Sequence, residues 1–122
     1  VYIAIGAGVV PVLEQVRAVL PNGSSSVKGV TVVWINGEAK DFDVTAELLE
    51  KEYFKYSTKL AVSCVVDDLQ LHAIEDNVEI NAVVPDFQQG TMAVLAGPEA
   101  MTKKAAAYLE ERGYPEDTIC IL

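Results

Sequence analysis

The chain has 122 residues, 51% of them apolar, which is the length of one domain with a full core and excludes an intrinsically disordered segment. Its formal net charge of −9 argues against nucleic acid and anionic membranes as partners, because these are bound by clustered Lys and Arg. No apolar run approaches the roughly 20 residues that span a bilayer, and no basic segment precedes the first apolar run as in a signal peptide. We therefore expect a soluble cytoplasmic or organellar domain that is neither secreted nor inserted in a membrane.

Strand-like and helix-like segments alternate along the first part of the chain. Residues 1–5 form an apolar run typical of a buried parallel strand. Over residues 9–20 the apolar side chains fall at helical spacing, which predicts a helix. Pro21-Asn22-Gly23 ends it, and the stretch up to Ser26 is typical of a loop. A second continuous apolar run over 30–35 predicts the next strand.

The middle of the chain predicts a further helix, a strand and a segment that stays ambiguous. Asp41 or Asp43 is placed to cap a helix. Residues 60–66 predict a third strand. Residues 67–89 predict a long connection with either a short helix or a short strand. The side chains that the helix would direct inward are Val44, Leu48, Leu49 and Phe54, and those that alternate in the connection are Val78, Ile80, Ala82 and Val84.

The last third repeats the strand–helix–strand pattern. Residues 92–96 predict a strand, 98–112 a helix stopped by Gly113, and 118–122 a final strand. Side chains that would form the apolar face of this helix are Met101, Ala105, Tyr108 and Leu109. The alternation predicts an α/β fold, a parallel sheet with helices on both faces. We expect a doubly wound, Rossmann-like, five-stranded sheet in the order 3-2-1-4-5.

Two glycine turns carry the functional signal. The first predicted strand runs into Gly6-Ala7-Gly8-Val9-Val10-Pro11, and the fourth into Gly97-Pro98-Glu99-Ala100-Met101. A strand, a glycine turn and a helix N-terminus direct backbone amides outward, an arrangement suited to phosphate. Two such turns in one parallel sheet predict a nucleotide across its carboxyl-terminal edge. Each turn alone also fits an ordinary strand–helix connection.

Together the two turns resemble the pyridine-nucleotide-binding domain of the ferredoxin–NADP reductase superfamily, which includes cytochrome b5 reductases and nitrate reductases. A Gly-x-Gly-x-x-Pro turn and a later Gly-Pro-x-x-Met turn occur here in that order, and the resemblance covers nearly the whole chain. It implies a single NAD(P)-binding domain over residues 1–122, excised from a longer flavin-dependent reductase. The flavin, FAD or FMN, would be held on a separate partner domain.

The resemblance also implies roles for individual residues. The first turn would pass close to the nicotinamide and pyrophosphate, Asn36 would lie near the adenosine ribose, and the second turn would line the nicotinamide pocket. The cofactor-binding residues so implied are Gly6, Ala7, Gly8, Pro11, Asn36, Gly97, Pro98 and Met101. No catalytic side chain and no metal site is implied. NADH is expected rather than NADPH, because Lys40 is the only positive residue near Asn36 in the sequence.

Departures from the family pattern keep other functions open. Ala96 stands where the family usually has cysteine, and the chain ends in Leu122 rather than an aromatic residue. These differences motivate a non-catalytic domain of the same fold used for assembly or regulation. A flavodoxin-like or receiver-type module is a third alternative, which the glycine after the first strand disfavours.

Several chemically versatile residues fit ordinary structural roles. Cys64 and Cys120 lie in apolar strand-like runs, which predicts buried free thiols. We expect Trp34 to be a packing residue, with contact to an adenine as the alternative. The remaining candidates lie in polar segments, where we expect solvated side chains: His72, Asp67-Asp68, Glu75-Asp76 and Ser24-Ser25-Ser26.

Overall fold

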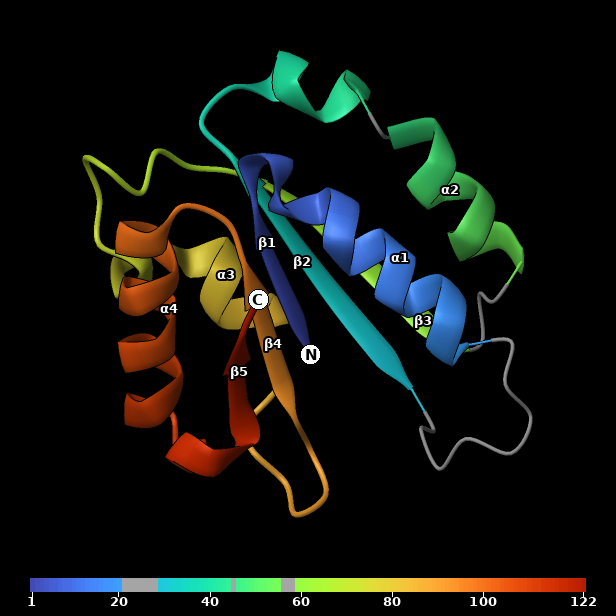
Figure 1. The fold of residues 1–122 in the computed structure, drawn as a ribbon. Helices are drawn as coiled ribbons and strands as arrows, with labels where there is room; N and C mark the ends of the chain where they lie inside the picture. Colours follow the sequence, from blue (N-terminus) through green and yellow to red (C-terminus); the bar gives the residue numbers. More distant parts are fainter. Residues whose placement is uncertain (21–28, 45, 56–58) are drawn as a thin grey trace.

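The chain forms one parallel sheet with helices on both faces (Figure 1). The computed structural model describes residues 1–20, 29–44, 46–55 and 59–122. Within these residues, five strands pair in parallel in the order β3-β2-β1-β4-β5, which confirms the predicted fold and order. The strands are β1 (Tyr2–Ile5), β2 (Val30–Asn36), β3 (Leu60–Val66), β4 (Ala93–Ala96) and β5 (Ile119–Ile121).

Helices α1 (Val9–Val19) and α2 (Ala46–Lys55) lie over one face of the sheet, and α3 (Val78–Val83) and α4 (Glu99–Glu111) over the other (Figure 1). Short 3-10 turns complete the chain: η1 (Gly6–Gly8), η2 (Ala39–Val44), η3 (Ile74–Asp76) and η4 (Glu116–Thr118). The predicted helix over 98–112 is thus one residue shorter at each end, with Pro98 at its N-cap.

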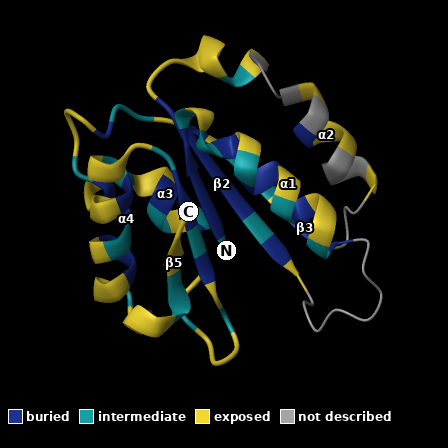
Figure 2. Ribbon diagram, in the orientation of Figure 1, coloured by how far each residue is buried: buried dark blue, intermediate teal, exposed yellow. Residues whose placement is uncertain are grey.

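The central strands alternate between two apolar layers. Ile3 and Ile5 of β1 pack with side chains of α3 and α4, whereas Ala4 packs with side chains of α1. The same alternation runs along β2, where Val33 faces the first layer and Trp34 the second. Figure 2 shows the result, with buried central strands and exposed outer helix surfaces. Burial on both faces explains why these strands are continuous apolar runs in the sequence.

The structure resolves one open sequence expectation and contradicts another. The ambiguous connection contains a helix, α3, which Asn77 caps by accepting a hydrogen bond of 2.9 Å from the backbone of Ile80. Asp41 and Asp43 lie inside η2 and therefore do not cap α2, which begins at Ala46. The position before α2, which would cap this helix, lies outside the described residues. So do the predicted helix stop at 21–23 and the loop over 21–26. The side chains of Val44, Leu48 and Phe54 are also not described. Leu49 is buried as expected.

The expectation of buried cysteines is wrong. Cys64 and Cys120 are both exposed free thiols. Each lies on an outer strand of the sheet, β3 or β5, which has a neighbouring strand on one side only within the described residues. Such strands have less cover than central ones, so an apolar run does not by itself imply that every side chain is buried.

Candidate functional site

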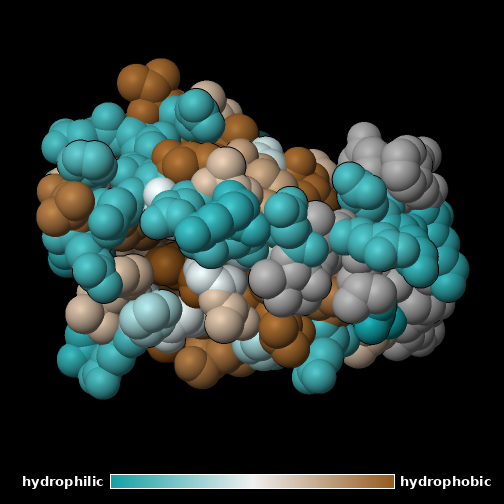
Figure 3. Space-filling model, turned by 90° about the horizontal axis from the view of Figure 1, so that it is seen from above, coloured by the Kyte–Doolittle hydropathy of each residue, from teal (hydrophilic) through white to brown (hydrophobic). Residues whose placement is uncertain are grey.

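A cleft of about 860 Å³ opens at the carboxyl-terminal edge of the sheet. Figure 3 looks down on this edge, where a band of hydrophilic residues crosses the face between paler and more hydrophobic ones. All eight residues that the sequence analysis assigned to a nucleotide line this one cleft: Gly6, Ala7, Gly8, Pro11, Asn36, Gly97, Pro98 and Met101. Its volume is within the range of roughly 300–1,000 Å³ typical of small-molecule sites.

The two glycine turns touch each other at the floor of the cleft. A Cβ atom added at Gly8 would lie 2.2 Å from the carbonyl oxygen of Ala96. The glycine is therefore required by the close approach of the turn after β1 to the end of β4. Gly6, in contrast, has a φ of +61°, and a Cβ there would meet nothing nearer than Asn36 Oδ1 at 3.9 Å. The backbone at Gly6 is thus the part of this turn that a ligand can approach.

Trp34 is a packing residue, as expected. Its side chain is buried, and its ring meets that of Phe42 edge-on at a centroid distance of 4.9 Å. Its Nε1 donates a hydrogen bond of 3.0 Å to the carbonyl oxygen of Gly6. The ring supports the first glycine turn from below and is not a surface on which a base could stack.

Asn36 lines the cleft and has a buried side-chain amide. The residue is only 6% exposed, and its Nδ2 has no hydrogen-bond partner in the described part of the chain. Its backbone is paired, because its carbonyl oxygen accepts from the amide of Asp67 at 2.9 Å. A buried amide without a partner costs about 1–3 kcal/mol. A water or a ligand oxygen that reached this amide would satisfy it.

The N-termini of two helices lie at this cleft. Helix α1 begins after Gly8 and helix α4 after Pro98, and neither cap residue supplies a side-chain hydrogen bond. The amide of Val9, the first residue of α1, already donates to the carbonyl oxygens of Gly6 and Ala7, whereas the first turn of α4 has no side-chain cap. Helix N-termini carry partial positive charge and favour anionic ligand groups.

The walls of the cleft are acidic. Four carboxylates line it, from Glu38, Asp41, Asp67 and Asp68, and no Lys, Arg or His is among the lining residues. Positive potential at the site therefore comes from backbone amides and not from side chains. Such a site discriminates against ligands with additional negative charge near the walls.

Asp67 differs from the expected solvated carboxylate. Its side chain is only 7% exposed and accepts hydrogen bonds from Asn77 Nδ2 at 2.7 Å and His72 Nδ1 at 2.9 Å. Burial raises its pKa, but these hydrogen bonds outweigh burial, so the pKa lies below the ordinary value of 3.8. His72 itself is exposed, as expected. The carboxylate joins the end of β3 to the start of α3.

Residues 67–70 form a wall of the cleft that the sequence analysis did not assign. A signal existed, because they follow β3 directly and the carboxyl ends of parallel strands meet at one edge. Ile5, Ile35 and Leu122 also line the cleft.

Within the described residues, no group of three or more His, Cys, Asp or Glu could hold a metal ion.

Solved structures of other proteins share this fold. The chain superposes with a TM-score of 0.77 on the cytochrome b5 reductase domain of Ulva prolifera nitrate reductase, at 23% identity, covering 99% of this chain and 47% of that one. It matches a flavohemoglobin from Malassezia yamatoensis with bound FAD and heme at a TM-score of 0.72 and 19% identity, covering 99% and 30%. The CS-b5R domains of human Ncb5or in the NAD+ form match at 0.73 and 18%, covering 98% and 35%.

These likenesses show that the chain has the same fold as these domains. The chain spans about half the length of the first of these structures and about a third of the others. No protein-family model matches the chain, and no curated protein sequence matches it. No helix in the described ranges has the length and apolar character to cross a membrane.

Proposed function

We propose that the chain is the nicotinamide-nucleotide-binding module of a flavin-dependent oxidoreductase. The cleft would hold NAD(P)H across the two glycine turns, facing a flavin, FAD or FMN, on a separate domain. The nucleotide supplies the hydride, so the module needs no acid or base of its own. The residues of the module bind the nucleotide and orient it.

The unpaired amide of Asn36 is the observation that carries this proposal. It lies in a cleft bordered by two helix N-termini without side-chain caps, which together present donors to an anionic, oxygen-rich ligand. In a dinucleotide, ribose oxygens would accept from Asn36 Nδ2, and the pyrophosphate would meet the amides after Gly6. The residues present therefore fit the group.

The acidic walls favour NADH over NADPH. A 2′-phosphate near Asn36 would enter a cleft that Glu38 and Asp41 also line. Lys40 is near in sequence, but its Nζ pairs with Glu38 at 3.1 Å. Repulsion from carboxylates disfavours the additional phosphate, whereas the hydroxyls of an NADH ribose would meet acceptors.

A non-catalytic domain used for assembly or regulation is the second candidate. Ala96 and the acidic walls favour it, because neither supplies a side chain that reacts or binds phosphate. The two functions differ in one property: turnover of an artificial electron acceptor with NADH by the parent protein would exclude the second. A chain that binds no nucleotide would support it.

Saturation-transfer NMR of the chain with NADH, NADPH and AMP tests the proposal. We expect NADH to bind, and Asn36→Leu to abolish binding while the free energy of unfolding stays equal or rises by about 1 kcal/mol, since the variant removes an unsatisfied buried amide. Gln89→Leu removes an exposed amide away from the cleft and should bind normally. Absence of NADH binding by the unaltered chain, or full binding by Asn36→Leu, would contradict the proposal.

A further inference from the structure

A second hollow, which shares Asp67 with the cleft, lies between the end of β3 and the start of α3. It measures about 480 Å³. Three large aliphatic side chains line it and are well exposed: Val66 at 53%, Leu71 at 77% and Val78 at 81%. Exposed aliphatic residues are common singly, but three around one hollow are a feature of interaction surfaces. We name Val66, Leu71 and Val78 the aliphatic rim.

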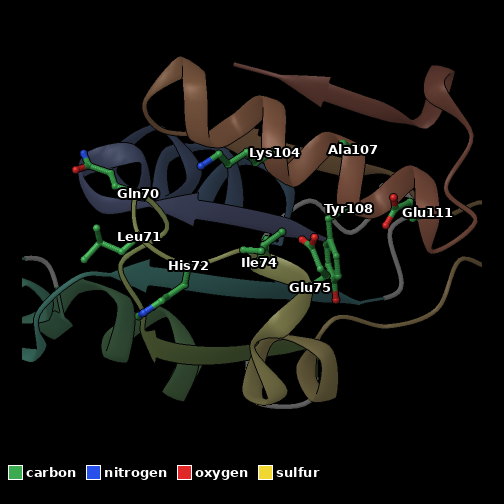
Figure 4. Close-up of a pocket in the computed structure, with 10 residues that line it drawn as sticks. Gln70, Leu71, His72, Ile74, Glu75, Lys104, Ala107, Tyr108 and Glu111 are labelled. Atoms are coloured by element: carbon green, nitrogen blue, oxygen red, sulfur yellow. The ribbon is translucent and has the colours of Figure 1, made fainter.

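The backbone beneath the aliphatic rim is braced from two sides. Asp67 joins His72 and Asn77 through hydrogen bonds of 2.9 and 2.7 Å, which tie the start of the connection to the start of α3. Lys104 of α4 donates to the carbonyl oxygen of Leu69 at 3.1 Å. Figure 4 shows Lys104 reaching toward the connection, whereas Leu71 and His72 point away from α4. The rim is therefore presented outward on a preformed support, which lowers the ordering cost of binding.

The charges at the hollow select a partner of positive charge. Asp76 and Glu79 line it and are exposed, and neither forms an ion pair with any residue that the structure describes. Asp67 adds a third carboxylate, and His72 is the only basic side chain among the lining residues. With a net charge of −9 on the chain, a basic segment is attracted over a distance and an acidic one is repelled.

We propose that this hollow docks a basic segment of a partner protein, in which a large aliphatic side chain is flanked by lysine or arginine. The aliphatic side chain would pack among Val66, Leu71 and Val78, and the flanking cations would meet Asp76 and Glu79. Apolar contact supplies affinity, and the carboxylates supply selection.

Methyl NMR of the chain tests the proposal with a short amidated peptide that has leucine flanked by lysines on both sides. We expect shifts concentrated on the methyl groups of the aliphatic rim, and binding about tenfold weaker in Val78→Ser and in Leu71→Ser, because each loses a buried aliphatic contact. The other methyl signals report whether each variant is folded. The same peptide with glutamates in place of the lysines should not bind.

Matched controls separate docking from general attraction to an acidic protein. Val10→Ser removes an equally simple exposed valine on α1, and Glu110→Gln removes an exposed carboxylate on α4; both should bind the lysine peptide normally. The double variant Asp76→Asn, Glu79→Gln should bind the lysine peptide more weakly than the unaltered chain. Shifts spread over the whole surface, equal losses in the controls, or no shift at all would overturn the proposal. So would a concentration-dependent dimer in sedimentation that Val78→Ser abolishes, which would make a second copy of the chain the occupant.

Discussion

The indole Nε1 of Trp34 donates a hydrogen bond of 3.0 Å to the carbonyl oxygen of Gly6. This contact joins the end of β2 to the turn after β1, two segments that lie 28 residues apart in the sequence. It places a fully packed aromatic ring directly beneath the backbone that we propose contacts the nucleotide. Fold stability and site geometry are therefore coupled at this residue.

Replacing Trp34 with phenylalanine breaks that coupling. The variant leaves the Gly6 carbonyl without its donor and opens space beside Phe42, so we expect the free energy of unfolding to fall by about 2–3 kcal/mol. Urea unfolding measures the loss. Tyr114→Phe is the matched control, because it also removes one hydrogen bond to a carbonyl, that of Pro85 at 2.7 Å, far from the cleft. We expect NADH binding to weaken in Trp34→Phe and not in Tyr114→Phe. Equal weakening in both variants would mean that the Trp34 ring has no specific effect on the site.

Gly8 is expected to be intolerant of any side chain. In Gly8→Ala the new Cβ would collide with the backbone of Ala96, which has no flexible end to move, so we expect destabilisation of at least about 3 kcal/mol. Gly113→Ala is the comparison, because its φ is +94° but nothing lies within 4 Å; there we expect about 1–2 kcal/mol from backbone strain alone. Thermal and urea unfolding of both variants measure the difference. Equal costs would show that the contact between the two turns is not tight.

The stability of the chain should depend on pH through Asp67. Its pKa in the folded chain is lowered below 3.8, so the unfolded chain takes up this proton first as the pH falls. The stabilisation is complete well above pH 4 and is lost as the pH falls through the folded pKa. Urea unfolding at pH 7 and pH 3 should show a smaller loss for Asp67→Asn than for the unaltered chain. Asp117→Asn, which removes an exposed carboxylate in η4, serves as the control and should leave the loss unchanged.

The fold could be predicted from the sequence because its central strands are buried on both faces. Continuous apolar runs such as those of β1 and β2 are typical of buried parallel strands, and their alternation with helical spacing predicts a parallel sheet covered by helices on both faces. Burial on the outer strands is harder to predict, because these strands are only partly covered. Cys64 and Cys120 are therefore exposed although they lie in apolar runs. Helix α3 has only six residues, and its alternating valines and isoleucine resemble a strand. Its cap at Asn77 was the local signal for a helix.

The site could be predicted in part for a similar reason. Residues at the ends of β1, β2 and β4 meet at one edge in any sheet of this order, so the eight assigned residues come together. The burial of Asp67 could not be predicted, because it depends on His72 and Asn77 folding back across a polar connection. The close contact of Gly8 with Ala96 likewise depends on how two turns distant in sequence approach each other. Such contacts follow from tertiary packing and have no local signature.

Charge reversal at Glu38 should change the preference between nucleotides, if the proposed function holds. Glu38→Arg removes a carboxylate from the cleft and releases Lys40 from its ion pair of 3.1 Å. A guanidinium binds phosphate through paired hydrogen bonds, so we expect the affinity for NADPH relative to NADH to rise about tenfold. Fluorescence titration with both nucleotides measures the ratio. Glu110→Arg changes the net charge equally at a distance from the cleft and should leave the ratio unchanged. An equal rise in both variants would mean that net charge alone acts, and no rise in Glu38→Arg would place the adenosine ribose elsewhere.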